Sequence, residues 1–248
     1  MKRTLLSLAV CFCMLSPLAS GALVDEFSFL KDLPAFVQYV DVVRNEGDYR
    51  KAEELRTGLP GIGLEKEKQT VLEIRAATLL SRLYTEVEPK DLNRSEELLK
   101  EAEQLLMALE KNSFFGLILE AEIDSIHYLI NPRNLGKGIS SNSKINKAYK
   151  QHPDQVYARL MKASSLLYAP SIAGGDVNKA LQIYLELLRD GVSILSRWDT
   201  ASLYSNIGVV SMKRGEWSTA KGYLDAAKAL YRFDPTLDAY LKEVQAKL

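Results

Sequence analysis

Two histidines are the first candidates for chemistry, because imidazole is a common acid–base catalyst and metal ligand. His127 and His152 lie 25 positions apart, and Asp124 precedes His127 by three positions, a helical spacing. Such a pair needs at least one further converging ligand to bind a metal. We therefore interpret His127 as a partly buried side chain beside a carboxylate, and His152, before Pro153, as a helix C-terminal residue. Neither is predicted to be catalytic or to bind a metal.

Sequence signatures of other reactive sites are incomplete. The segment 136–138 reads Gly-Lys-Gly but lacks the earlier glycine and the following Ser or Thr of a phosphate-binding loop. Segment 141–144 matches Ser-x-x-Lys without its companion motifs, and four polar residues in an expected loop produce this match readily. Segment 58–63 contains Pro60, unlike a dinucleotide fingerprint. We predict a protein that is not an enzyme and that uses no cofactor.

A basic run is the most unusual charge feature. Between Ser125 and Pro153 the chain has no Asp or Glu. The basic residues of this run are Arg133, Lys137, Lys144, Lys147 and Lys150. They could form a patch that docks an acidic segment, a carboxylate or lipid headgroups. The interpretation that we prefer is that these basic residues lie on a loop and a helix face exposed to solvent. Nucleic acid is not an expected partner, because 32 basic residues balance 32 acidic ones in the whole chain.

Segment 1–22 has the pattern of a bacterial export signal. Lys2 and Arg3 precede an apolar stretch at 4–15, and small residues at 20–22 form a cleavage site. We therefore predict a signal peptide at 1–22 and a mature domain at 23–248, located in the periplasm or secreted. A buried first helix is the alternative. No later apolar run approaches the roughly 20 residues of a membrane helix, so an integral membrane protein is not expected.

Both cysteines, Cys11 and Cys13, lie inside this predicted signal. The mature chain would then contain no cysteine, which excludes thiol catalysis, disulfides and cysteine-bound metals. Residues 8–11 read Leu-Ala-Val-Cys and loosely resemble a lipoprotein-processing box, although Val10 is larger than the residue usually found there. Lipidation at Cys11 is therefore a minor alternative to cleavage after Ala22.

Apolar residues recur at helical spacing through almost the whole mature chain. One stripe contains Val71, Ile74, Leu79, Leu80 and Leu83, and another contains Leu98, Leu99, Leu105, Leu106 and Leu109. Alternating apolar runs joined by Asn-Gly or Asp-Gly turns are missing from the sequence. The periodicity therefore predicts an all-α fold.

A short turn recurs three times and indicates repeated helix pairs. Its copies lie at 47–52, 175–180 and 215–220. Each copy begins with glycine, continues with Asp or Glu, and has alanine at its sixth position. We expect Gly47, Gly175 and Gly215 to end one helix at positive φ. The acidic residue then begins the next helix, and the alanine lets the two helices approach closely.

The last copy resembles part of the tetratricopeptide repeat. The matching positions are Tyr204, Ile207, Gly208, Gly215, Ala220 and Ala227, and a first copy matches at Phe36, Val43, Gly47, Tyr49 and Ala52. The interval from Gly175 to Gly215 exceeds the roughly 34 residues of the standard repeat, so the units are elongated. The Pro-x-x-x-Gly-Gly stretch at 170–175 is similar to a turn insertion in a group of exported bacterial repeat proteins, most of which have no assigned activity.

The resemblance implies a right-handed stack of antiparallel helix hairpins, an α-solenoid with about five hairpins and a C-terminal capping helix. We expect the first hairpin around the turn at 47–52. The others pair 71–87 with 93–111 and 114–130 with 143–151, then fill 154–190 and 200–232, before a cap at 237–248. The degenerate repeats leave the oligomeric state open.

The resemblance also implies a groove that holds a protein or peptide partner in the cell envelope. Its positions in the last repeat fall on Ser202, Ser205, Asn206, Val209, Met212 and Lys213. The alternative is a small-molecule or lipid-binding accessory protein of a transport system. It is suggested by tyrosines that could line an apolar channel, although tyrosines at this spacing more often belong to a core. These are Tyr157, Tyr168, Tyr184, Tyr204 and Tyr223.

Overall fold

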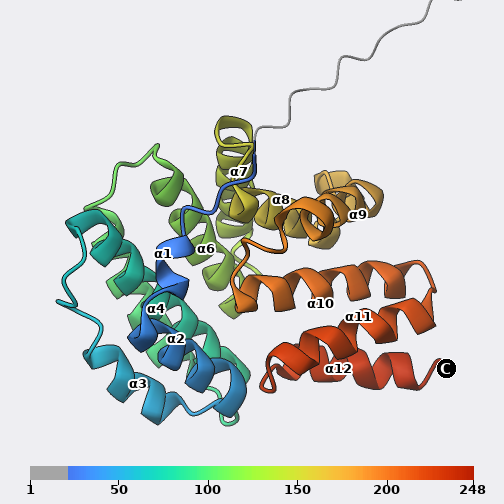
Figure 1. Cartoon of the computed structure of the whole chain (residues 1–248), viewed down its shortest axis with the longest axis horizontal. Helices are drawn as coiled ribbons and strands as arrows, with labels where there is room; N and C mark the ends of the chain where they lie inside the picture. The colour runs from blue at the N-terminus through green and yellow to red at the C-terminus, as the bar shows by residue number, and fades with distance from the viewer. Residues whose placement is uncertain (1–21) are drawn as a thin grey trace, which may run out of the picture.

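The computed structural model of the chain describes residues 22–248 (Figure 1). Within this range the chain is helical, and its one contact of β type is an isolated bridge between Val24 and Gln155. The all-α prediction is therefore confirmed. The predicted signal up to residue 21, both cysteines and the lipidation alternative at Cys11 lie outside the described residues.

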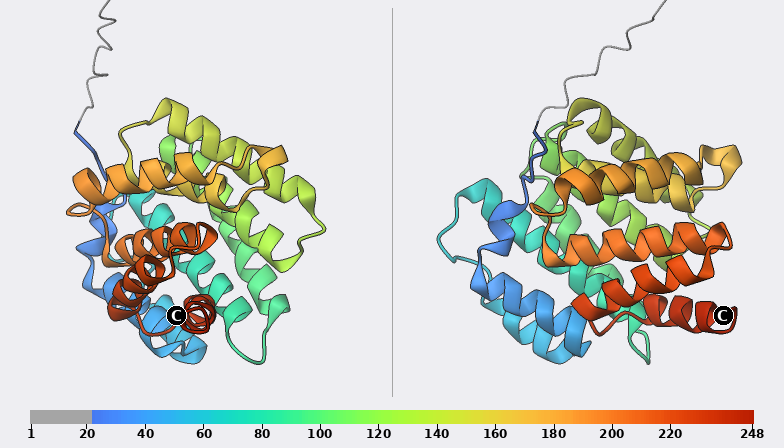
Figure 2. Two further views of the ribbon diagram at one scale, coloured as in Figure 1. Left: turned by 90° about the vertical axis from the view of Figure 1, so that its right-hand side faces the viewer. Right: turned by 45° about the vertical axis from the view of Figure 1, so that its right-hand side comes forward.

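The helices pair in chain order into five hairpins followed by a capping helix (Figures 1 and 2). The short helix α1 (Ser28–Lys31) comes first. In the first hairpin, α2 (Pro34–Asp41) and the π-helical turn η1 (Val42–Glu46) pair with α3 (Tyr49–Thr57). The other four hairpins are α4 (Lys66–Glu86) with α5 (Leu92–Leu106), α6 (Phe114–Ile130) with α7 (Leu135–Gln151), α8 (Val156–Tyr168) with α9 (Val177–Glu186), and α10 (Arg197–Lys213) with α11 (Trp217–Leu230). Between and after these lie the 3₁₀ turn η2 (Ser171–Ala173), the π-helical turn η3 (Leu187–Gly191) and the cap α12 (Pro235–Gln245). The predicted hairpin stack and cap are confirmed.

Helix α7 is longer than predicted, because it begins at Leu135 and not near residue 143. Its first half is rich in glycine and serine, which favour turns over helices when no tertiary contact opposes them. Here Ser141 donates a hydrogen bond to the Ala121 carbonyl at 2.8 Å, and its hydroxyl lies 2.7 Å from that of Ser125 on α6. The Ser-x-x-Lys match at 141–144 thus lies within a helix and not in a loop.

The recurring turns form largely as expected, with one correction. Gly47 and Gly215 have φ of 64° and 74°, and the side chain of Asp48 accepts two backbone N–H groups at the start of α3. In the middle copy the positive φ of 87° belongs to Gly174, so the prediction for Gly175 was wrong. Gly175 is required for a different reason: a Cβ there would lie 1.9 Å from the Ala169 carbonyl oxygen. In the two-glycine insertion, Gly174 therefore adopts the positive φ, and Gly175 allows the close approach of the Ala169 carbonyl.

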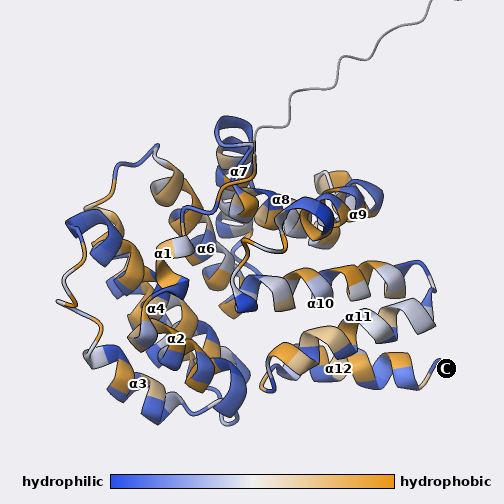
Figure 3. Cartoon of the chain, viewed as in Figure 1, coloured by the Kyte–Doolittle hydropathy of each residue, from blue (hydrophilic) through white to orange (hydrophobic). Residues whose placement is uncertain are grey.

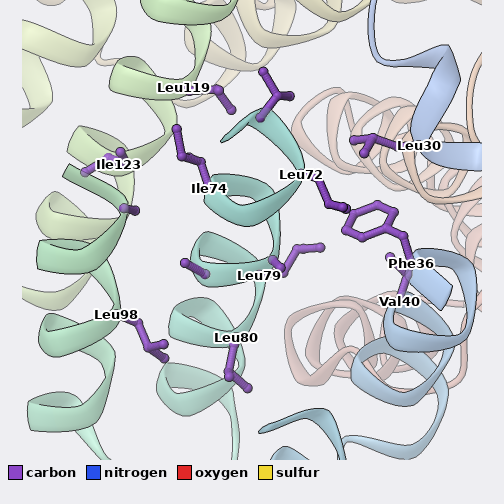
Figure 4. Packing of buried hydrophobic residues seen from close by; sticks show 14 of the residues in the cluster. Leu30, Phe36, Val40, Leu72, Ile74, Leu79, Leu80, Leu98, Leu119 and Ile123 are labelled. Atoms are coloured by element: carbon purple, nitrogen blue, oxygen red, sulfur yellow. The ribbon is translucent and has the colours of Figure 1, made fainter. Parts of the chain in front are cut away.

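The largest part of the core surrounds α4. This helix lies between α2 on one side and α5 and α6 on the other (Figure 4). Leu72, Leu79 and Leu80 are fully buried with Phe36 and Leu98 in one cluster that extends over these helices. Most other helices keep one apolar and one polar face (Figure 3). Two smaller clusters continue the core through α8–α10 and α10–α12, as expected when each hairpin buries its apolar side against its neighbours.

The stack curls until its first hairpin contacts its last (Figures 1 and 2). The Phe233 N–H, between α11 and α12, donates to the Arg44 carbonyl at 2.7 Å. On α10, the Trp198 ring lies 4.5 Å from the Arg44 guanidinium and 5.8 Å from that of Arg75 on α4. The segment that begins at Val24 forms backbone hydrogen bonds with Asp154 and Val156 before and at the start of α8, and its Phe27 lies in the main core cluster.

Replacing Gly175 by Ala should destabilise the fold by about 2–4 kcal/mol, because the new Cβ meets a backbone carbonyl that cannot move without opening the turn. Gly222→Ala is the matched control: it lies within α11 with no atom within 4 Å of its Cβ, and should stabilise by up to about 1 kcal/mol. Urea unfolding measures both. Equal effects of the two substitutions would contradict this account of the turn.

Candidate functional site

A surface cleft at the C-terminal end of the stack is the best candidate for a binding site. It encloses about 290 Å³ between the end of α8, the last turns of α10 and α12. Its lining residues are Tyr168, Val209, Met212, Lys213, Tyr240 and Glu243. Three of these, Val209, Met212 and Lys213, belong to the predicted groove. We call this hollow the C-terminal cleft.

The C-terminal cleft combines an apolar floor with charged groups at its rim. Val209 is 4% exposed and Met212 is nearly buried, whereas Lys213 and Glu243 are exposed. Within residues 22–248 neither the Lys213 ammonium nor the Glu243 carboxylate belongs to an ion pair of the structure. Such a cleft suits a ligand with an apolar body and a carboxylate that can reach Lys213.

The remaining predicted groove residues have other roles. The Asn206 side chain accepts a hydrogen bond from the Tyr168 hydroxyl at 2.9 Å and donates one to Ser164 at 3.2 Å. Asn206 therefore holds Tyr168 beside the cleft. Ser202 and Ser205 are half-buried and lie outside the cleft lining.

The basic run does not form one continuous cationic surface. Lys137 and Lys144 contact opposite oxygens of the buried Asp124 carboxylate, at 2.8 and 2.6 Å. Lys137 also lies 3.1 Å from Glu103, and Lys147 donates a hydrogen bond to Asn112. Arg133, Lys147 and Lys150 remain exposed. The neutralising carboxylates come from α5 and α6, outside the run, so counting charges along the run could not reveal them.

Burial alone would raise the pKa of Asp124, but the hydrogen bonds from Lys137 and Lys144 lower it below its ordinary value. His127 lies 3.1 Å from the Glu103 carboxylate, so its acidic neighbour is Glu103 and not Asp124. His152 caps the C-terminus of α7, and its ring meets Phe114 edge-on at 5.6 Å. Among the described residues, no group of three or more His, Cys, Asp or Glu side chains is arranged to hold a metal.

The predicted tyrosines do not share one channel. Tyr184 is fully buried in the core, Tyr204 and Tyr223 pack against each other with centroids 6.3 Å apart, and Tyr168 is 52% exposed in the C-terminal cleft. Tyr157 instead joins a group of charged residues on the inner side of the stack.

That inner group was not predicted from the sequence. Arg75 of α4 is 6% exposed, and its Nη1 donates to the Glu122 carboxylate at 2.7 Å and to the Tyr157 hydroxyl at 2.6 Å. Its Nε is buried without a partner. The sequence does contain a signal: Arg75 stands midway between Val71 and Leu79 on an apolar stripe, where a charge has to be buried.

Two carboxylates near Arg75, those of Asp25 and Asp199, are also buried, with the residues 9% and 6% exposed. Burial raises the pKa of Asp199, whose carboxylate accepts the Ser196 hydroxyl at 2.6 Å. Burial and then the charge of Asp199 raise the pKa of Asp25 to about 6, against the weaker effects of the Phe27 N–H, Lys31 and Arg75. We name Arg75, Glu122, Tyr157, Asp25 and Asp199 the inner cluster.

Replacing Asp25 by Asn should stabilise the fold at neutral pH and have little effect in acid. The folded-state pKa lies above the ordinary value of 3.8, so the folded chain binds the proton more tightly than the unfolded chain. The stability linked to this proton is complete below about pH 4 and is lost as the pH rises through about 6. Asn keeps an acceptor for the Phe27 N–H without the charge.

After allowance for solvent screening, the expected gain at pH 8 is about 1–2 kcal/mol, shrinking toward zero at pH 4. Urea unfolding across this range measures it. Asp32→Asn, at an exposed position just after α1, is the control for the loss of one carboxylate. If Asp25→Asn raises the free energy of unfolding equally at pH 4 and pH 8, the folded chain does not raise the pKa of Asp25.

Within residues 22–248, no helix combines the length and the apolar character that a bilayer crossing requires. Comparison with known proteins gives no matching family model, no significantly similar curated protein and no significantly similar solved structure. The geometry thus identifies an all-helical protein of stacked helix pairs.

Proposed function

We propose that this chain is an exported, non-enzymatic scaffold, similar to tetratricopeptide-repeat proteins, that binds a protein or peptide partner in the bacterial cell envelope. The C-terminal cleft is the observation that carries the proposal. It joins an apolar floor at Val209 and Met212 to the exposed ammonium of Lys213. These positions were expected to face a partner on the basis of the sequence alone.

The chemistry of the cleft suggests how a peptide segment would bind. An apolar side chain would lie on Met212 and Val209, while a terminal or side-chain carboxylate would pair with Lys213. The Tyr168 hydroxyl, which donates its proton to Asn206, can accept a peptide N–H, and the Tyr240 hydroxyl can donate or accept along the cleft. Asn206 supports this arrangement because it fixes the Tyr168 hydroxyl.

Export is the other part of the proposal. It depends on the signal pattern of residues 1–22, with cleavage near Ala22 leaving a mature chain that begins at Leu23. The mature chain would carry two more acidic than basic residues, because Lys2 and Arg3 are removed from a balanced chain.

A small-molecule ligand is a second candidate, and the observation that favours it is the volume of the C-terminal cleft. Its volume of about 290 Å³ is close to the lower end of the range for small-molecule sites, roughly 300 Å³. Native mass spectrometry of the purified chain would test this candidate. A co-purifying compound that disappears in a Met212→Trp variant, whose larger side chain fills the cleft, would favour it over a peptide.

Reversing the charge of Lys213 should weaken partner binding by roughly tenfold, because the partner carboxylate would then face another carboxylate. The mature chain, immobilised at physiological salt, is exposed to an envelope extract, and retained proteins are quantified by mass spectrometry. Lys90→Glu is the charge-matched control: it is exposed and lies in the turn between α4 and α5, away from the cleft.

The proposal requires a protein that both wild type and the Lys90→Glu chain retain and the Lys213→Glu chain loses. Proteins retained equally by all three chains do not use the cleft. If all three chains retain every captured protein equally, the cleft is not the binding site and the proposal fails.

A further inference from the structure

The first described residues lie on the inner side of the stack in the manner of a bound peptide. The Val24 N–H donates to the Asp154 carbonyl at 3.0 Å, and the Val24 carbonyl accepts the Val156 N–H at 2.9 Å. The Gln155 side chain then accepts the Glu26 N–H at 3.2 Å. This pattern is a minimal form of strand addition, in which main-chain hydrogen bonds hold an extended segment. We call residues 23–27 the N-terminal strap.

An aromatic side chain anchors the N-terminal strap. Phe27 is 5% exposed, and its ring centroid lies 4.9 Å from that of Tyr157, 5.2 Å from Phe115 and 5.7 Å from Phe114. The Arg75 guanidinium lies 5.1 Å from the same ring. These partners come from α4, α6 and α8, so the pocket is built by three hairpins and not by the strap. Together with residues 154–156 they form what we call the strap site.

The N-terminal strap does not fit this site well at one position. Asp25 is buried beside Asp199, and the repulsion between the two carboxylates opposes docking. The hydrogen bond that Asp25 accepts comes from within the strap itself, the Phe27 N–H at 3.0 Å. Arg75 is committed to Glu122 and Tyr157. A segment with an uncharged residue at this position would keep the backbone and aromatic contacts without the repulsion.

We propose that the strap site binds an extended peptide segment of a partner, and that the N-terminal strap occupies it in the free chain. In the bound segment, the residue that takes the place of Val24 pairs with Gln155 through its backbone. The next residue, in the place of Asp25, is uncharged, and the residue in the place of Phe27 is aromatic. This site is separate from the C-terminal cleft and does not depend on it.

Reversible locking of the strap tests the proposal. Val24→Cys combined with Gln155→Cys places two thiols at the bridged positions, and residues 23–248 contain no other cysteine. The oxidised form holds the strap in its site. In the reduced form the strap is free to leave, and loss of the Gln155 contact to Glu26 favours its departure. The same protein therefore serves as its own control.

The probes are three fluorescent peptides that span residues 22–33: the native sequence, its Asp25→Asn form and its Phe27→Ala form. The reduced chain should bind the native peptide, and the oxidised chain should bind it at least tenfold more weakly, because the site is then occupied. At pH 7.5 the Asp25→Asn peptide should bind about tenfold more tightly than the native one. The Phe27→Ala peptide should bind at least tenfold more weakly.

Two results would overturn the proposal. One is a reduced chain that keeps its helical circular dichroism but binds none of the peptides, or binds the Phe27→Ala form as well as the native one. The other comes from hydrogen exchange in the wild-type chain. The Val24 and Val156 amides should exchange through local opening, faster than amides of the buried helix α4. If the Val24 and Val156 amides exchange as slowly as the α4 amides, the strap leaves its site only when the whole chain unfolds.

Discussion

Two buried guanidinium groups, one in the first hairpin and one in the second, contact Trp198 of the last hairpin where the stack closes. Arg44 pairs with Glu86 at 2.8 Å, and the two side chains are only 5% and 8% exposed. Arg75 pairs with Glu122, and Trp198 of α10 lies between the two guanidinium groups. Burial alone would lower the pKa of Arg75, but Glu122 and its neighbours raise it above its ordinary value, so the charge is retained. Breaking such a buried pair costs about 3–5 kcal/mol.

We call the contacts of Arg44 and Arg75 with Trp198 the seam, and it restricts which surfaces are open to a partner. Helical hairpins that stack in an open curve leave their inner side accessible. Here the inner side contains the seam, the inner cluster and the N-terminal strap, whose Phe27 lies in the main core cluster. The C-terminal cleft lies apart from these groups, at the end of the stack where Lys213 and the cap α12 meet solvent, whereas the strap site opens only when the strap leaves it.

The parts of the fold that depend on local sequence were predictable, whereas those that depend on distant contacts were not. The turn at Gly47 and Asp48 needs only a residue tolerant of positive φ and a capping carboxylate, and both are visible in the sequence. Three of the positions that the repeat resemblance places in a groove, Val209, Met212 and Lys213, line the C-terminal cleft, because they follow one face of one helix. Arg75 and Asp25 were missed, because Glu122 and Asp199, the carboxylates that act on them, lie far away in the sequence. The position of Arg75 on an apolar stripe indicates burial but does not identify these carboxylates.

Closure also restricts how the architecture can change in length. In an open array each unit interacts with its neighbours only, so units can be gained or lost at the ends. Here Phe233 bonds to the Arg44 carbonyl, and a Cβ at Gly47 would lie 2.4 Å from the Phe233 ring. An added or missing pair of helices would shift these groups apart by a whole repeat. A change in the number of hairpins would therefore break the contact between the first hairpin and the last.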